Sequence, residues 1–359
     1  MIEEVSIYQN SNDMHAALRR LQVDQRVSAE NKKVISKFID TWIAKGVTKS
    51  RAAKVIYCLR YMAGWLETPF ETASKDELIT LVGKLEQQKY AEHTKYDFKV
   101  ILKTFYKWLK GDDEQYPKEI SWLKAKLKSK HKLPEELLTP EEVQQIANAA
   151  SHPRDRALIL VLYESGCRIG EMLMLKVKNI QFDQYGAVLK VYGKTGHRRV
   201  RIITSALALK TWLDFYEAAK NPDAYVWPPL ASNNRETNHP ALHRSIIDMV
   251  RKLTEKAGVK KKVYPHLFRH SRATFLASKF TEAQMKEHFG WQQNSDMAAV
   301  YVHLSGRDVD KTLLSLQGIT QQAETTPSET TYCQKCGQKN QQNSKYCSSC
   351  GISIMALAH

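Results

Sequence analysis

YPHLFRHSRAT, from Tyr264 to Thr274, is the stretch around which the rest of this sequence can be interpreted. Pro265 suits the first turn of a helix, and on that helix His266 and Arg269 lie one turn apart on the same face. Such a pair suits a phosphodiester, because Arg can hold two phosphate oxygens while His donates to or accepts from a third group. Taken alone, an H-x-x-R pattern is more often a core histidine beside a surface arginine, so its meaning depends on other stretches.

The composition favours a globular protein that binds a polyanion. The chain has 359 residues, 43% of them hydrophobic, which is enough for two or more cores. Its 54 Lys and Arg against 38 Asp and Glu give a net charge of +16, so nucleic acid is the expected partner. No apolar run is long enough for a membrane span, and the N-terminus lacks the pattern of a signal peptide. We therefore expect a cytoplasmic protein without a membrane partner.

Residues 26 to 111 are predicted to form an all-helical, DNA-clamping domain, after an N-terminal segment, 1 to 25, that shows no clear pattern. Apolar residues recur at helical spacing, and Ser74 with Glu77 predicts a capping box. Lysines at every third or fourth position form a row, here called the lysine stripe: Lys95, Lys99, Lys103, Lys107 and Lys110. Such a stripe is usually a solvated face, but the net charge favours contact with phosphates.

A basic linker is predicted for residues 112 to 138. It could lie along a duplex backbone, although a solvated linker explains its composition nearly as well. A second domain, residues 139 to 319, then begins with Thr139 as a helix N-cap and Pro140 in the first turn.

A second candidate phosphate ligand, Arg168, follows a very apolar helix and Gly166. The glycine marks a turn, so Arg168 is expected at the start of a new helix, where free N–H groups already favour an anion. Glu171, one turn later, could hold the guanidinium in place. A purely structural Arg–Glu pair explains these two residues about as well.

The residues around G-K-T-G predict a β-hairpin, because β-forming residues cluster at 187 to 191 and 200 to 203. Lys194, near its tip, could swing towards a phosphate as a proton donor. The simpler interpretation is a solvated turn lysine.

The C-terminal region carries two C-x-x-C-G motifs, with Cys333, Cys336, Cys347 and Cys350. A short amphipathic helix at 307 to 316 and a polar tether at 320 to 331 precede them. Four thiolates at this spacing predict a tetrahedral zinc ribbon over residues 332 to 353 that needs its metal to fold, with iron or a redox pair as alternatives. Cys58 and Cys167 stand alone in helical patterns.

These separated motifs occur together, in the same order, in a known family. The pattern L-x-x-x-G-x-R-x-x-E-x-x-x-L at 162 to 175, the G-K-T-G hairpin, H-L-F-R-H, Gly290 with Trp291, and Y-V-H-L at 301 to 304 resemble the tyrosine recombinases, or phage integrase family. The similarity is greatest to archaeal integrase or Xer-like members. It implies a mainly α, multidomain protein: a helical core-binding domain, an α+β catalytic domain that is mostly helical with a small hairpin, and the added zinc ribbon.

The resemblance also implies the chemistry. This family attacks the scissile phosphate with a tyrosine, without a metal, and leaves a 3'-phosphotyrosyl link and a free 5'-hydroxyl. Tyr301 matches the nucleophile, and a phenol with an ordinary pKa of about 10 needs a polarised phosphate and a nearby base. Arg168 and Arg269 match the pair that stabilises charge on the non-bridging oxygens.

Three further roles come from the same resemblance. Lys194 would protonate the leaving 5'-oxygen, and His266 would assist proton movement at Tyr301. Trp291 stands where most members carry a histidine, so its single N–H donor would bind or buttress the phosphate without exchanging a proton. The other histidines in these motifs, His270, His288 and His303, are expected to be structural.

Two functions remain open on the sequence. A site-specific recombinase would act as a tetramer on two double-stranded DNA sites, and a type IB-like topoisomerase would use a similar residue set on one duplex. The compact helical domain and the short C-terminal helix favour the recombinase. A DNA-binding protein that has lost catalysis is disfavoured by the intact residue set.

Overall fold

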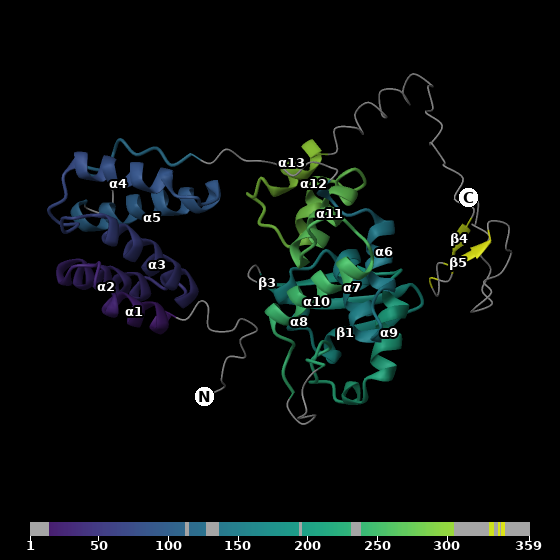
Figure 1. Ribbon diagram of the computed structural model, residues 1–359. Helices are drawn as coiled ribbons and strands as arrows, with labels where there is room; N and C mark the ends of the chain where they lie inside the picture. The colour runs from purple at the N-terminus through teal and green to yellow at the C-terminus, as the bar shows by residue number, and fades with distance from the viewer. Residues whose placement is uncertain are drawn as a thin grey trace, which may run out of the picture. The chain divides into compact units, whose positions relative to one another are not determined.

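The computed structural model describes residues 14–111, 115–126, 136–193, 196–230, 238–304, 330–333, 337 and 339–341. These residues group into two compact units, one within Tyr8–Lys130 and one within His131–His359 (Figure 1). Within the described ranges no helix combines the length and the apolar character needed to cross a bilayer.

In the N-terminal unit the described residues form helices joined by loops, as predicted. Its helices are α1 (Met14–Val23), α2 (Ala29–Ala44), α3 (Lys49–Trp65), α4 (Lys75–Gln87) and α5 (Glu92–Lys110). The capping box at Ser74 and Glu77 is present, because each side chain accepts a hydrogen bond from the other residue's backbone N–H. Helix α1 was not anticipated, since its stretch is largely polar and buries only Leu21. The aromatic residues of α5 pack inwards, with Phe105 edge-on to Phe38 at 5.2 Å between ring centroids.

Every lysine of the lysine stripe has an intramolecular partner. Lys95 and Lys99 both pair with Glu86, and Lys110 pairs with Glu119 at 3.1 Å. The Nζ atoms of Lys103 and Lys107 lie over the ring of Tyr116, at 4.2 and 5.7 Å from its centroid. The net charge favours contact between these lysines and phosphates. To make that contact, each lysine has to leave its intramolecular partner or bind both at once.

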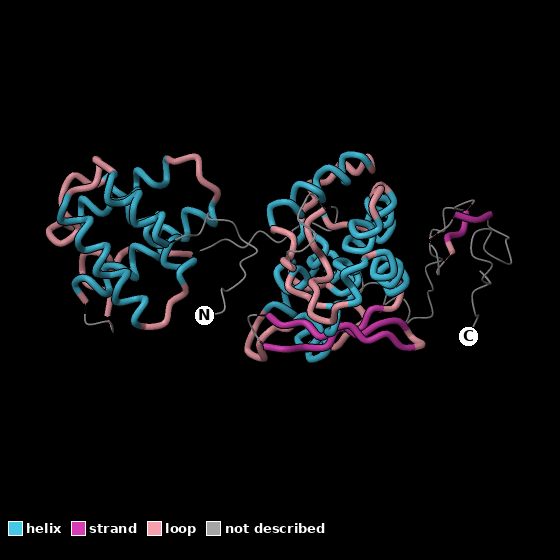
Figure 2. Tube along the Cα trace, turned by 90° about the horizontal axis from the view of Figure 1, so that it is seen from below, coloured by secondary structure: helices cyan, strands magenta, loops and turns pink. Residues whose placement is uncertain are grey.

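The C-terminal unit places helices against a small antiparallel sheet (Figure 2). The helices are α6 (Pro140–Asn148), α7 (Pro153–Ser165), α8 (Ile169–Leu173), α9 (Ala206–Phe215), α10 (His243–Lys256), α11 (Pro265–Ala277), α12 (Glu282–Phe289) and α13 (Met297–Leu304), with 3-10 turns at Val177–Asn179 and Glu217–Lys220. The strands are β1 (Ile180–Asp183), β2 (Gly186–Gly193) and β3 (Gly196–Ile202), in the order β1-β2-β3. Strand β1 was not anticipated, because only one of its four residues is even half-buried.

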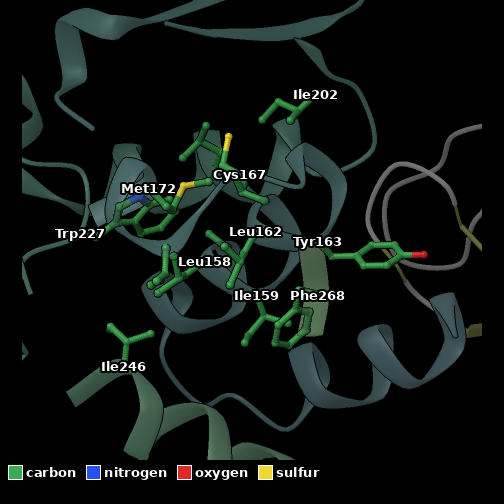
Figure 3. Close-up of a cluster of buried hydrophobic side chains, with 14 of the residues drawn as sticks. Leu158, Ile159, Leu162, Tyr163, Cys167, Met172, Ile202, Trp227, Ile246 and Phe268 are labelled. Atoms are coloured by element: carbon green, nitrogen blue, oxygen red, sulfur yellow. The ribbon is translucent and has the colours of Figure 1, made fainter. Parts of the chain in front are cut away.

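Helix α7 lies at the centre of this unit. Its side chains Leu158, Ile159 and Leu162 are fully buried and pack in one cluster with Trp227 and Phe268 (Figure 3). A helix that is apolar on nearly all sides has to be covered on nearly all sides, as its sequence indicated. The core thus fixes the C-terminal end of α7, which leads directly to Arg168.

The predicted hairpin is formed by β2 and β3. Gly193 and Gly196 face each other across its end, and Lys194 lies outside the described residues. Val200 and Ile202 on β3 point into the core, and Arg198 follows the same two-residue alternation. An arginine on the inward face of a strand needs a partner.

At the C-terminal end, strands β4 (Thr330–Tyr332) and β5 (Lys339–Gln341) form a separate antiparallel pair. Strand β4 begins within the predicted tether, whose last two residues, 330 and 331, belong to the strand. The predicted helix at 307 to 316 and the rest of the tether lie outside the described residues.

Candidate active site

Arg168 is positioned by a turn that only glycine fits well. Gly166 ends α7 in the left-handed region, with φ of +58°, and a Cβ atom there would lie 2.4 Å from Cε1 of Phe289. Arg168 is then the N-cap residue of α8, as expected. Its backbone N–H and Nη1 donate to the two carboxylate oxygens of Glu171, at 2.9 and 2.8 Å. Glu171 thus holds both the backbone and the guanidinium of Arg168.

Arg198 is a second arginine on the same carboxylate, and the sequence interpretation missed it. Its Nη1 and Nη2 donate to Oε1 and Oε2 of Glu171 at 2.8 and 2.7 Å. Burial would raise the pKa of Glu171, but the hydrogen bonds and charge of Arg198, followed by those of Arg168, bring the pKa down to about 2. The available signal was the inward position of Arg198 on β3.

Arg269 is buried, with 3% of its surface exposed. Its Nη1 donates to the carbonyl of Gly166 at 2.8 Å, and Nη2 donates to the carbonyl of Phe289 at 2.7 Å. Its guanidinium carbon lies 5.0 Å from the ring centroid of Phe289 and 5.7 Å from that of Trp291. Burial, and then the positive charge of Arg168, lower the pKa of Arg269 to about 10, so it remains charged at neutral pH.

The C-terminal end of α12 receives all three arginines. The carbonyls of His288, Phe289 and Gly290 accept hydrogen bonds from Arg198 Nε (3.0 Å), Arg269 Nη2 (2.7 Å) and Arg168 Nη2 (3.4 Å), respectively. The last carbonyls of a helix have no partner within it, and the helix dipole makes this end negative. The C-terminal end of α12 therefore binds the three cationic side chains favourably.

Tyr301, on α13, is 3% exposed. Its ring stacks on that of Trp291, with centroids 5.5 Å apart and planes at 3°. Its hydroxyl oxygen lies 2.5 Å from Nδ1 of His270. Burial raises the pKa of Tyr301 to about 12, although the charge of Arg269 opposes the rise. The phenol is accordingly neutral and poorly nucleophilic in this state.

His266 is exposed and points its ring edge-on to His270, at 5.0 Å between centroids. Partial burial of the ring, and then the charges of Arg269 and Arg168, lower the pKa of His266 and so favour its neutral form. The described residues record no hydrogen bond between His266 and Tyr301. His270, which was expected to be structural, is the histidine against the phenol oxygen.

The structure thus brings most of the predicted site residues together. Arg168 and Arg269 meet at the end of α12, Trp291 links Arg269 to Tyr301, and Glu171 supports Arg168. Lys194 lies outside the described residues. A Cβ atom on the preceding Gly193 would come 2.3 Å from Oε1 of Glu171, so the hairpin passes directly beside this carboxylate.

The described part of the ribbon fits one half of a metal knuckle. Cys333 is buried, and its carbonyl accepts a hydrogen bond from the N–H of Gly337, which has φ of +73°. This left-handed turn is the one expected after a C-x-x-C pair. Cys336, Cys347 and Cys350 lie outside the described residues, within which no group of three or more His, Cys, Asp or Glu side chains could hold a metal.

The cluster as a whole carries more positive than negative charge. Arg168, Arg198 and Arg269 face the single carboxylate of Glu171. Guanidinium groups in a partly buried site bind phosphate oxygens strongly, and Arg168 keeps part of its side chain exposed for such a contact. The arrangement can therefore bind a phosphodiester beside a buried tyrosine.

Comparisons with known proteins bear on the same region. Residues 136–307 match the phage integrase family, and residues 332–354 match a zinc-ribbon domain. The chain is similar to tyrosine recombinase XerA of Pyrococcus horikoshii, with 23% identity over 284 residues, which are 78% of this chain and 92% of that protein. It is also similar to tyrosine recombinase XerC of Natranaerobius thermophilus, with 28% identity over 236 residues, 62% of this chain and 75% of that protein.

Solved structures share the fold. XerH site-specific recombinase, bound to a palindromic difH substrate in a post-cleavage complex, aligns with a TM-score of 0.63 at 16% identity over 88% of this chain and 91% of that one. A lambda integrase dimer bound to a COC' core site aligns with a TM-score of 0.60 at 15% identity, covering 77% of each chain. These identities support the fold alone.

The motifs, the arginine cluster beside Tyr301 and the matched region coincide in one part of the chain. The mainly helical architecture with a small antiparallel sheet is confirmed. Residues 136–307 are thus a domain of the phage integrase family, whose members, the tyrosine recombinases, cleave and rejoin DNA strands, and residues 332–354 match a zinc-ribbon domain.

Proposed function

We propose that this recombinase cleaves DNA by attack of Tyr301 Oη on the scissile phosphate, which leaves a 3'-phosphotyrosyl link and a free 5'-hydroxyl. The observation that carries the proposal is the meeting of Arg168 and Arg269 at the end of α12, one residue before Trp291, whose ring stacks on Tyr301. A tyrosine beside two guanidinium groups has both the nucleophile and the charge stabilisation that the reaction needs.

The arginines act on the phosphate oxygens. In this proposal, Arg168 and Arg269 bind the non-bridging oxygens and stabilise the charge that builds on them in the transition state. Glu171 and Arg198 do not touch the phosphate; they hold Arg168 in place. Because the cluster keeps an excess of positive charge, it favours the more negative transition state over the diester.

Proton transfer requires further residues. Lys194, which follows Gly193 in the sequence, is proposed as the acid that protonates the 5'-oxygen. His266 assists proton movement on the side of Tyr301. Trp291 offers one N–H and no exchangeable proton, so it buttresses the phosphate and the tyrosine ring.

The proposed substrate is double-stranded DNA, cut at paired sites by a tetramer in the cytoplasm. XerH has been solved on a difH substrate, and a lambda integrase tetramer has been solved on a Holliday junction. The net charge of +16 suits such a partner. Nothing in the site or in the relatives favours the type IB topoisomerase alternative.

For the C-terminal segment we propose a structural zinc ion held by Cys333, Cys336, Cys347 and Cys350. Gly337 supports this ligand set, because it follows the first C-x-x-C pair, has a left-handed backbone conformation and donates its N–H to the carbonyl of Cys333. When bound, zinc would supply cross-linking only, and no step of DNA cleavage involves it.

The test is a suicide DNA substrate with a nick near the cut, on which a covalent protein–DNA adduct accumulates and is read on a denaturing gel. Tyr301→Phe removes only the hydroxyl, so this variant should bind its site normally and form no adduct. Arg168→Ala and Arg269→Ala should slow adduct formation by about 10²-fold or more through lost charge stabilisation. An adduct that persists in Tyr301→Phe would move the nucleophile to another tyrosine, with Tyr264 the first to examine.

A modified substrate separates the proposed acid from the arginines. When sulfur replaces the bridging 5'-oxygen, the leaving group needs no proton. This substrate should largely rescue Lys194→Ala but not Arg168→Ala. Equal rescue of both variants, or of neither, would contradict the assignment of Lys194 as the acid.

A further inference from the structure

The phenol oxygen of Tyr301 faces an imidazole that the mechanism above does not use. Nδ1 of His270 lies 2.5 Å from Oη, and the two ring centroids are 5.9 Å apart with planes at 37°. Trp291 covers one face of the tyrosine ring. The oxygen that must become the nucleophile is thus already in hydrogen-bonding contact with a group that can take its proton.

His266 is less well placed for this task. Its ring lies edge-on to that of His270 at 5.0 Å, and it feels the positive charges of Arg269 and Arg168. Those charges disfavour a second positive charge on His266. His266 is therefore better suited to a hydrogen bond with a phosphate oxygen, or to supporting His270, than to direct proton abstraction from Tyr301.

The need for a base is clear from the environment of Tyr301. Burial raises the pKa of this phenol to about 12, so very little phenolate exists at neutral pH. Proton removal during bond formation avoids a free phenolate, and a base in hydrogen-bond reach of the reacting oxygen is the geometric requirement for it. His270 meets that requirement.

We propose that His270 is a catalytic residue that accepts the proton of Tyr301. The proposal rests on the assignment of Tyr301 as nucleophile. In the tautomer with its proton on Nε2, Nδ1 of His270 accepts from the phenol. As Oη bonds to phosphorus, the O–H bond breaks and the proton passes to Nδ1, while the bond from phosphorus to the 5'-oxygen breaks and that oxygen takes a proton from Lys194. In the rejoining step the imidazolium returns its proton to the phenol.

The first test compares two substitutions of histidine by asparagine. His270→Asn places an acceptor oxygen near the position of Nδ1 but supplies no base, so adduct formation should slow by about 10²- to 10⁴-fold with DNA binding unchanged. His152→Asn is the matched control. His152 caps the N-terminus of α7 through its side chain, and asparagine caps equally well, so cleavage should stay at the wild-type rate.

The second test separates a base from a residue that only positions the ring. A fluorinated tyrosine at position 301 has a more acidic phenol and depends less on a base. It should therefore recover much of the rate lost in His270→Asn while changing the wild-type rate little. The substrate with a bridging 5'-sulfur should rescue Lys194→Ala but leave His270→Asn slow, since the two residues act on different protons.

Each outcome bears on a separate claim. Wild-type cleavage by His270→Asn overturns the proposal, and so does a slow variant that fluorinated tyrosine fails to rescue, because that result assigns His270 to positioning. An adduct in Tyr301→Phe instead overturns the nucleophile assignment, whatever the His270 variants do. Circular dichroism and DNA binding of each variant establish that a lost rate is not lost folding.

Discussion

The buried carboxylate of Glu171 holds two guanidinium groups at once. Its oxygens accept from Arg168 and, in a two-pronged contact, from Arg198. Burying a carboxylate costs free energy unless the group is paired and fully hydrogen-bonded. Here the contacts with the arginines outweigh the effect of burial, since the pKa of Glu171 falls to about 2. This residue therefore stabilises the fold and positions the site together.

Glu171→Gln should lower the stability of the catalytic unit in a pH-dependent way. In the folded protein the pKa of Glu171 is about 2, below its ordinary value of 4.5. The charged carboxylate therefore stabilises the fold above pH 5, and this stabilisation is lost as the pH falls towards 2. The shift corresponds to at most about 3 kcal/mol. Calorimetry of the full chain should show a lower unfolding temperature for the variant at pH 7 and a gap that narrows towards pH 3.

The control for Glu171→Gln is Asp183→Asn. Asp183 also accepts two hydrogen bonds from one arginine, Arg201, but this pair is exposed on the sheet. Solvent screens such a pair, so the control should change stability little at any pH. A pH-independent gap for Glu171→Gln would show that the carboxylate acts through packing and not through its charge.

At the scale of elements, sequence reasoning located the helices with strong local signals. Helix α11 begins at Pro265, and α6 begins with the capping box of Thr139 and Glu142. Local signals fail where an element is exposed or short: α1 is polar, and β1 is a four-residue edge strand. Helix α1 forms because it packs on α3, and β1 forms because it pairs with β2.

The site residues also divide into those that local sequence patterns predict and those that they do not. The motif residues could be predicted because their types and spacing are distinctive, whereas the contacts of Arg198 with Glu171 and of His270 with Tyr301 join residues 27 and 31 positions apart. Only the fold brings such pairs together. A weak signal did exist for His270, which follows His266 by one helical turn and so shares its face.

The lysine stripe on α5 gives a prediction at this scale. Glu86 pairs with both Lys95 and Lys99, but Lys95 also pairs with Glu92 at 3.4 Å, so Glu86→Gln should release Lys99 towards DNA. Binding should tighten, and the log-log salt slope should steepen by about 0.9 for each phosphate gained. Fluorescence anisotropy with a labelled duplex at several salt concentrations measures both effects.

Asp214→Asn is the control, because it makes the same change in net charge on α9, where Asp214 pairs with Lys210. If the lysine stripe contacts phosphates, only Glu86→Gln should steepen the slope. Equal effects of the two variants would mean that net charge alone acts and that the stripe is a solvated face.

At the scale of the whole molecule, the described residues proposed for DNA cleavage and the described strands of the ribbon lie in different parts of the chain. The residues proposed for strand cleavage that the structure describes all lie between Arg168 and Tyr301 in one compact unit, and the strand pair β4–β5 follows as a separate element. A small ribbon has too few apolar residues for a core of its own and depends on cross-linking for stability. The metal and the cleavage chemistry should accordingly be separable.

Chelation provides the test of that separation. A strong chelator should remove zinc from the full chain, and Cys333→Ser should prevent its binding, yet both should form the Tyr301 adduct on a suicide substrate at the wild-type rate. Cys58→Ala is the matched control, since Cys58 is buried in the N-terminal unit and its loss should leave the zinc content unchanged. Zinc is measured by a colorimetric dye after denaturation. If a chelator stops adduct formation by Cys333→Ser, a second metal acts at the cleavage site, because this variant has lost a ribbon ligand and its chemistry should be independent of the ribbon.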